Sequence, residues 1–180
     1  EGGQGMVIAS SSAGFIYYDA NSGGANSLLR NEGNWAFVDC TKEVGLDHNN
    51  QRISYAAAWE DYDDDGDPDL YVANDYGRNN LYRNDGGRFT DVAGEANAED
   101  SASGMSVAWA DYDRDGWMDL YVANMFSAAG SRITRQALFK PGADDETRGI
   151  YRRFAKGNSL FRNVGGGRFE EVGSEAAVEM

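Results

Sequence analysis

Short apolar runs separated by turns rich in Asn, Asp and Gly recur along the chain. Two of these runs, residues 54–59 and 104–109, alternate large and small side chains, which predicts strands with two unlike faces. Two others, residues 69–74 and 119–124, share the word Leu-Tyr-Val-Ala-Asn and are apolar on both faces, as expected of central strands. The large face of the first run carries Tyr55, Ala57 and Trp59. Its small face suits close approach by a neighbouring sheet.

A second pattern, Leu-x-Arg-Asn followed by a Gly-containing turn and another short apolar run, occurs three times. The Leu-x-Arg-Asn words lie in residues 26–31, 79–84 and 158–163. Asn or Asp with Gly between two strand-like runs is a strong hairpin signal. The pattern therefore predicts two further strands in each unit, the second of them carrying Arg-Phe-x-x-Val in the two later copies.

Four short strands in each unit of roughly fifty residues, repeated along a chain, are typical of a β-propeller blade. The predicted fold class is all-β, a propeller segment built of four-stranded antiparallel blades. We expect a partial blade and connection over residues 1–53, a full blade over 54–103 and a second full blade over 104–180.

An acidic loop joins the first two predicted strands of each full unit. The loops read Asp-Tyr-Asp-Asp-Asp-Gly-Asp-Pro-Asp from Asp61 and Asp-Tyr-Asp-Arg-Asp-Gly-Trp-Met-Asp from Asp111. Carboxylates at positions 1, 3, 5 and 9 supply oxygen donors at the density that Ca²⁺ requires, and the carbonyl of position 7 can complete the shell. Glycine at position 6 permits a sharp turn. The loops predict one Ca²⁺ site each.

Two other structures could contain a loop of this composition. An EF-hand also begins Asp-x-Asp-x-Asp-Gly, but it needs a Glu at position 12 and flanking helices. Position 12 is Val72 or Val122 here, and the flanks are strand-like. A solvated acidic turn without an ion is the other alternative, against which stand the mutual repulsion of the carboxylates and the return of the same spacing.

These repeats resemble the FG-GAP/VCBS repeat family, which includes the integrin α-chain propeller and bacterial cartilage-acidic-protein-like repeat proteins. The resemblance covers nearly the whole chain, although the Phe-Gly and Gly-Ala-Pro words that name the family are absent. It implies Ca²⁺ in the loop between strands one and two of each blade, and it implies that Asp64 and Arg114 point to solvent. The implied ligands are Asp61, Asp63, Asp65 and Asp69 through side chains and Asp67 through its carbonyl, then Asp111, Asp113, Asp115 and Asp119 with the carbonyl of Trp117.

Thirty acidic against sixteen basic residues give a net charge of −14. Such a chain repels nucleic acid and anionic membrane surfaces, and no apolar stretch reaches the ~20 residues of a membrane span. Ca²⁺ sites of extracellular modules bind with a Kd of roughly 10⁻⁴–10⁻³ M, so they would fill outside the cytosol. We therefore expect an extracellular, periplasmic or cell-surface protein.

The single cysteine and the single histidine give little catalytic chemistry. Cys40 holds the place that Val92 and Val172 hold in the later copies, which predicts a small core residue. His48 lies in a polar connection and is expected in solvent. Without a second histidine or a reactive cysteine, neither a His-based triad nor a zinc site is indicated.

An insertion over residues 125–157 separates the second and third strands of the last unit. It holds seven bases and three acids, a net charge of +4. Acids at residues 144–146, bases near the end and Gly157 predict a helix. The insertion either binds a partner or an anionic glycan, or packs over its own blade and pairs with nearby acids.

The two and a half predicted units fall short of the 4–8 blades of a closed propeller. Residues 6–10, Met-Val-Ile-Ala-Ser, resemble a second strand, and both ends are expected to pack against further blades of the same chain or of a partner. We expect a non-enzymatic, Ca²⁺-stabilised module for protein–protein interaction, adhesion or assembly. The alternative is a carbohydrate-binding or carbohydrate-active propeller that stacks sugars on aromatics such as Tyr17, Tyr18, Tyr76 or Trp117.

Overall fold

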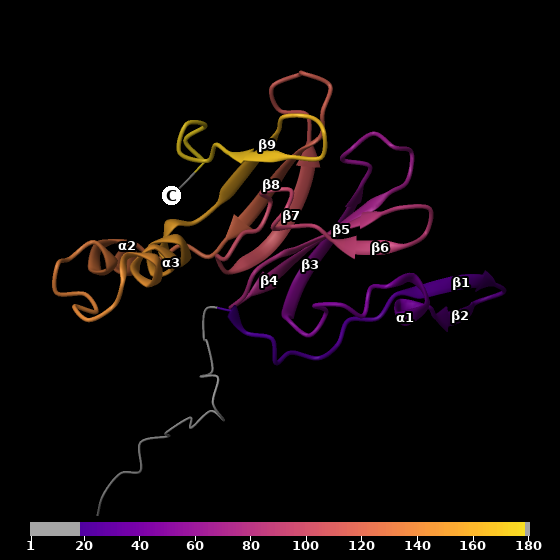
Figure 1. The fold of residues 1–180 in the computed structure, drawn as a ribbon, viewed down its shortest axis with the longest axis horizontal. Helices are drawn as coiled ribbons and strands as arrows, with labels where there is room; N and C mark the ends of the chain where they lie inside the picture. Colours follow the sequence, from indigo (N-terminus) through magenta and orange to yellow (C-terminus); the bar gives the residue numbers. More distant parts are fainter. Residues whose placement is uncertain (1–18, 179–180) are drawn as a thin grey trace, which may run out of the picture.

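The computed structural model describes residues 19–178, which form two four-stranded antiparallel sheets, a separate two-stranded hairpin and short helices (Figure 1). The N-terminal hairpin consists of β1 (Leu29–Gly33) and β2 (Ala36–Asp39) and is followed by α1 (Thr41–Val44). The predicted strand at residues 6–10 lies outside the described residues.

The first sheet contains β3 (Ile53–Glu60), β4 (Asp69–Asp75), β5 (Asn80–Asn84) and β6 (Phe89–Asp91), in that order across the sheet. The second contains β7 (Gly104–Ala110), β8 (Asp119–Asn124), β9 (Ser159–Asn163) and β10 (Phe169–Glu171) in the same order. The predicted four-stranded units are therefore confirmed. β4 is buried along its whole length, as expected of a strand that is apolar on both faces.

The two sheets pack face to face around one apolar core. Tyr71, Ala73 and Leu81 of the first sheet meet Leu120, Val122 and Phe161 of the second, and Trp109 of β7 stacks on Tyr62. Ala56, on the small face of β3, packs against this core. The predicted close approach on the small face of the first strand is thus observed.

One glycine lies at a close approach between the sheets. A Cβ atom added to Gly104, the first residue of β7, would lie 3.1 Å from the Cβ of Ala73 and 3.2 Å from Oδ1 of Asn79. Contacts this tight leave no room for a larger side chain. The absence of a side chain at Gly104 therefore allows β7 to lie this close to β4.

The insertion forms two helices, α2 (Ala128–Thr134) and α3 (Asp145–Lys156), which pack on each other beside the second sheet (Figure 1). The predicted helix is α3: the side chain of Asp144 caps its first turn and Gly157 ends it with a φ of 99°. Helix α2 had no clear signal in the sequence. Arg153 pairs with the buried Asp100, and Lys156 pairs with Glu171 at 3.0 Å. These two bases of the insertion thus pair with acids of the body, as its packing alternative requires.

Cys40 and His48 have the burial that the sequence predicts for each. Cys40 is buried, and its thiol lies 3.5 Å from the carbonyl oxygen of Leu28. His48 is exposed, while its backbone carbonyl accepts a hydrogen bond from the Tyr82 hydroxyl. Across residues 19–178, no helix has the length and apolar character to cross a membrane.

Candidate metal centres

The two acidic loops have the same backbone conformation. They join β3 to β4 and β7 to β8, and position 6 is glycine with a φ of 94° in both, Gly66 and Gly116. Position 4 is also left-handed, with a φ of 60° at Asp64 and 63° at Arg114. Glycine adopts such angles without steric cost, which explains why this residue follows the three aspartates. The repeated sequence therefore produces a repeated geometry.

Within each loop, the first aspartate accepts backbone hydrogen bonds that curl the chain around it. Asp61 accepts from the N–H groups of Asp65 and Gly66 at 3.1 and 2.9 Å. Asp111 accepts from Asp115 and Gly116, both at 3.1 Å. These bonds direct the carboxylates of positions 1, 3 and 5 toward one centre.

The structure brings three predicted ligands of each loop together. Carboxylate oxygens of Asp61, Asp63 and Asp65 lie within 4.8 Å of one another, and so do those of the second set, Asp111, Asp113 and Asp115. At this separation three negative charges repel strongly, while one divalent cation between them would be attracted to all three.

The fourth predicted carboxylate of each loop lies outside these triads. Asp69 is fully buried and accepts hydrogen bonds from the backbone N–H groups of Asn84 (2.7 Å) and Tyr62 (3.2 Å). Asp119 is held in the same way by Asn163 and Tyr112. Each carboxylate oxygen has two lone pairs, so these bonds leave acceptor capacity for a cation. Ligation by Asp69 and Asp119 stays a prediction.

Asp67 and Trp117 hold position 7 of the two loops and are predicted to ligate through their backbone carbonyls. Their side chains contact a neighbouring turn instead of the proposed metal centre. The carboxylate of Asp67 accepts from the N–H of Gly86 at 2.8 Å, in the hairpin turn between β5 and β6. The indole of Trp117 lies over Gly165, in the corresponding turn of the second sheet. Both side chains connect the acidic loop to the neighbouring turn, and their carbonyls as ligands remain a prediction.

Burial raises the pKa of several of these carboxyl groups. Loss of solvation raises the pKa of Asp69 to about 7, against the opposing effect of its two backbone hydrogen bonds. The pKa values of Asp63 and Asp119 are also raised, again mainly by burial. One carboxylate oxygen of Asp63, Oδ1, is buried without a hydrogen-bond partner. A bound cation would supply this oxygen with a partner, so the donor set fits a metal ion.

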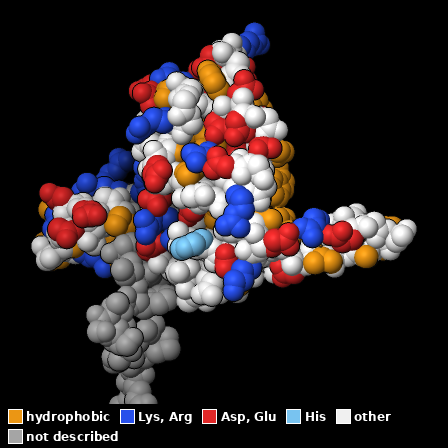
Figure 2. All heavy atoms as spheres, turned by 45° about the vertical axis from the view of Figure 1, so that its right-hand side comes forward, with side chains coloured by type: hydrophobic (Ala, Val, Ile, Leu, Met, Phe, Trp, Pro, Cys, Tyr) orange, Lys and Arg blue, Asp and Glu red, His pale blue; other side chains and the backbone are white. Residues whose placement is uncertain are grey.

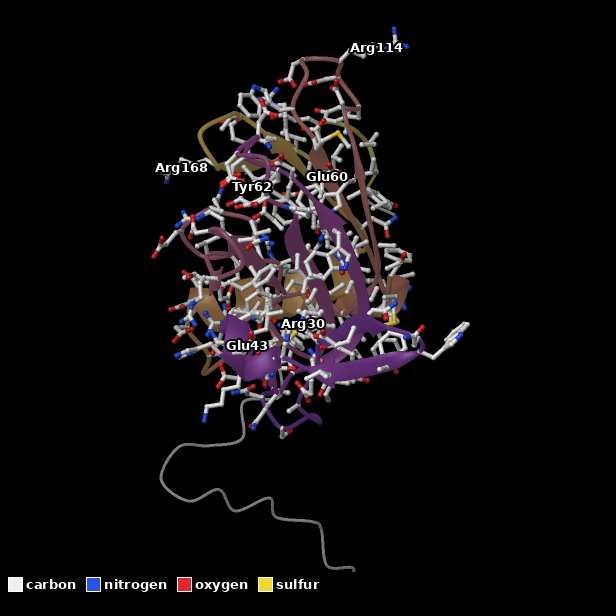
Figure 3. The ribbon with its side chains drawn as sticks, turned by 90° about the vertical axis from the view of Figure 1, so that its right-hand side faces the viewer. Arg30, Glu43, Glu60, Tyr62, Arg114 and Arg168 are labelled. Carbon is white, nitrogen blue, oxygen red and sulfur yellow. The ribbon has the colours of Figure 1, made fainter. Side chains whose placement is uncertain are left out.

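The first loop is enclosed more completely than the second. The amide of Asn163 in β9 donates to the carbonyl of Tyr62, and Gly167 of the following turn lies against the same tyrosine ring. Tyr62 is buried, whereas its counterpart Tyr112 is 44% exposed. The second loop has no such neighbour among the described residues, and Arg114 extends from it into solvent (Figure 3).

The structure also shows where the predicted solvent-facing residues and two of the predicted sugar-stacking aromatics lie. Asp64 and Arg114 are exposed, as the resemblance implied. Of the four aromatics proposed to stack on sugars, Tyr17 and Tyr18 lie outside the described residues. Tyr76 follows β4 and Trp117 precedes β8, so they lie at opposite ends of the sheets and form no shared platform.

Asn84 and Asn163 are the site residues that sequence reasoning missed. Their backbone amides hold Asp69 and Asp119, and their side chains donate to the carbonyls of Pro68 and Met118 at the end of each loop. The repeated Leu-x-Arg-Asn word contained the signal, since its final Asn occupies the same place in each sheet. The sequence did not show that this Asn contacts the end of the acidic loop, because that contact forms only when the third strand pairs with the second.

Comparison with protein families shows that residues 61–122 match the FG-GAP-like repeat. The matched region begins at the first aspartate of the first loop and ends inside β8, so it contains both acidic loops. Comparison with curated protein sequences gives no significant match.

Proposed function

Because residues 61–122 are an FG-GAP-like repeat, we propose that each acidic loop binds one Ca²⁺ ion and thereby stabilises the module. Side-chain ligands in the first loop are Asp61, Asp63, Asp65 and Asp69, with the carbonyl of Asp67. Those in the second are Asp111, Asp113, Asp115 and Asp119, with the carbonyl of Trp117.

The observation that carries this proposal is the convergence of three carboxylates in each loop, with ligand oxygens within 4.8 Å of one another. It occurs twice with one backbone conformation. All donors are oxygens, which favours Ca²⁺ or Mg²⁺ over softer metals. Ca²⁺ accepts six to eight oxygens in flexible geometry, whereas Mg²⁺ retains several waters in a strict octahedron. Five protein oxygens within nine residues suit Ca²⁺ better.

We further propose that the chain is part of a β-propeller that acts outside the cytosol as a non-enzymatic interaction, adhesion or assembly module. Two features favour this role. The two sheets stack face to face in the manner of adjacent blades, each with its strands in sequential order. Ca²⁺ sites of extracellular modules typically bind with a Kd of roughly 10⁻⁴–10⁻³ M, so loops of this kind would be filled in a compartment where the ion is abundant.

The experiment is thermal unfolding of the chain in Ca²⁺ and in EGTA, with two variants that each remove one charge from the first loop. Asp65→Asn changes a proposed ligand, while Asp64→Asn changes the exposed residue next to it. With free Ca²⁺ tenfold above Kd, each site contributes about 1.4 kcal/mol. Chelation is expected to lower Tm, and Asp65→Asn to remove about half of this effect.

Asp64→Asn should respond to chelation as the unmodified chain does. Equal Tm values in Ca²⁺ and EGTA for the unmodified chain would contradict the proposal. Equal effects of the two substitutions would show that the loop responds to net charge alone.

A further inference from the structure

The tip of the N-terminal hairpin carries two aromatic side chains that are largely exposed to solvent. Trp35, in the turn between β1 and β2, is 91% exposed, more than any other large apolar side chain of residues 19–178. Phe37 of β2 is 52% exposed. Figure 2 shows the hairpin projecting from the body of the molecule into solvent. Aromatic surface at such a place is available to a ligand.

The backbone of this turn is unfavourable for two of the residues that form it. Gly33, Asn34 and Trp35 all have a positive φ, of 87°, 49° and 63°. The turn between β9 and β10 has the same length, and glycine holds all three positions there, residues 165–167, with φ of 78°, 63° and 71°. Such angles are free of strain for glycine but uncommon for a bulky side chain. The fold of the turn therefore does not explain Trp35, which indicates a binding role for this residue.

The two aromatic rings share a small hollow with two amide side chains. Asn31, Asn34, Trp35 and Phe37 line a space of about 370 Å³. Asn31 pairs with Phe37 across the two strands, so their side chains lie on the same face of the hairpin. Oδ1 of Asn31 accepts a 2.8 Å hydrogen bond from the N–H of Gly33. This bond orients the amide and leaves its NH₂ group to donate to a ligand.

We propose that this hollow binds a neutral pyranose sugar of a glycan chain. One face of a pyranose ring presents C–H groups, which stack on an aromatic ring such as that of Trp35. The hydroxyl groups at its edge pair with amides, which can both donate and accept hydrogen bonds. The lining contains no charged side chain, and Arg30 and Glu32 of the same hairpin pair with each other at 2.6 Å. A neutral sugar therefore fits better than an acidic one, and the volume suits roughly one or two sugar rings.

The hairpin is held to the body by contacts that are separate from the acidic loops. The N–H of Cys40 donates to the carbonyl of Leu28 at 2.9 Å, and the N–H of Leu28 donates to the hydroxyl of Thr41 at 2.7 Å. Arg30 also pairs with Glu43 of α1 at 3.1 Å. None of these residues belongs to a proposed metal centre. Sugar binding is thus a function separate from the proposed Ca²⁺ binding and should not require the ion.

A glycan array probed with the full chain tests the proposal. The array carries neutral cello-, chito-, galacto- and manno-oligosaccharides beside sialylated and sulfated glycans. It is probed in Ca²⁺ and in EGTA, at a temperature where circular dichroism shows the chain to be folded. We expect saturable binding to at least one neutral glycan, with a Kd that changes by less than about twofold on chelation. Absence of binding to every neutral glycan, binding to acidic glycans alone, or loss of binding in EGTA would overturn the proposal.

Isothermal titration calorimetry with the tightest-binding glycan then locates the site. Trp35→Gly introduces the residue that the turn of the second sheet uses, so it should weaken binding at least about tenfold without lowering the urea midpoint of unfolding. Tyr55→Ala removes another aromatic, 61% exposed on the open face of the first sheet, and should bind as the unmodified chain does. Equal effects of the two substitutions on Kd would contradict a site at the hairpin. A lower urea midpoint for Trp35→Gly would show that the tryptophan stabilises the fold, which removes the reason for assigning it to a ligand.

Discussion

The side-chain amide of Asn163 donates a 2.8 Å hydrogen bond to the backbone carbonyl of Tyr62, a residue 101 positions earlier in the chain. The bond is buried and joins the third strand of the second sheet to the acidic loop of the first. A second bond from the same amide reaches the carbonyl of Met118 in the second acidic loop. One side chain thus holds both loops.

Replacing Asn163 should therefore destabilise the protein more than replacing Asn31, the final Asn of the Leu-x-Arg-Asn word in the hairpin. Asn163→Ala leaves two carbonyls without a donor, and we expect it to reduce the free energy of unfolding by about 2 kcal/mol. Asn31→Ala changes the equivalent residue of the exposed hairpin and should cost less than about 0.5 kcal/mol. Urea unfolding of both variants measures the difference. A similar cost for both would contradict the role assigned to Asn163.

The two proposed Ca²⁺ sites should differ in affinity. The second sheet encloses the first loop and buries Tyr62, while Tyr112 in the second loop is 44% exposed. An enclosed, preorganised loop loses less conformational freedom on binding. Calorimetric titration of Asp115→Asn, which retains the first site, should give a lower Kd than titration of Asp65→Asn, which retains the second. The opposite order would mean that enclosure does not control affinity.

The close approach of the two sheets predicts a size limit at Gly104. A valine there must displace Ala73 or Asn79, and overpacking of this kind costs roughly 1–3 kcal/mol. Gly142 is the control, because no atom lies within 4 Å of a Cβ added to it. Gly104→Val should lower Tm by several degrees and Gly142→Val by little. Differential scanning fluorimetry distinguishes them, and an unchanged Tm for Gly104→Val would refute the packing argument.

The basic insertion should contribute stability through Arg153. Its guanidinium lies 3.4 Å from the carboxylate of Asp100, which is fully buried. Arg153→Glu puts a like charge beside that carboxylate and should cost about 2 kcal/mol or more. Arg132→Glu, an exposed residue of α2, makes the same charge change as a control. Chemical denaturation showing equal stability for the two variants would contradict a packing role for α3.

The repeated words made most of the fold predictable. The positions of β4, β5, β8 and β9 followed from the repeated Leu-Tyr-Val-Ala-Asn and Leu-x-Arg-Asn words. Hydrophobic periodicity and turn residues are local properties, so a short stretch of sequence is enough to predict such strands. The spacing of the acidic loop likewise predicted the three carboxylates that converge in each loop, while the fourth predicted ligand, Asp69 or Asp119, lies outside that triad. Helix α2 escaped prediction because its sequence, Ala-Ala-Gly-Ser-Arg-Ile-Thr, contains residues of low helix propensity and folds against α3.

The contacts between sheets were not predictable in the same way. The bond from Asn163 to Tyr62 joins residues of different units, and a single unit contains no information about its neighbour. The burial of Asp69 and Asp119 was also missed, since an aspartate in an acidic loop is expected in solvent. The hydrogen bond between the sheets and the burial of these aspartates both depend on contacts between residues that are far apart in the sequence.

The stoichiometry of bound Ca²⁺ tests the central claim most directly. Equilibrium dialysis with ⁴⁵Ca²⁺ at saturating ion should give two ions per chain for the unmodified protein. Asp65→Asn and Asp115→Asn should each bind one ion, and the double variant none. Asp64→Asn should still bind two. No saturable binding to the unmodified chain, or two ions retained by the folded double variant, would contradict the assignment of the acidic loops as calcium sites.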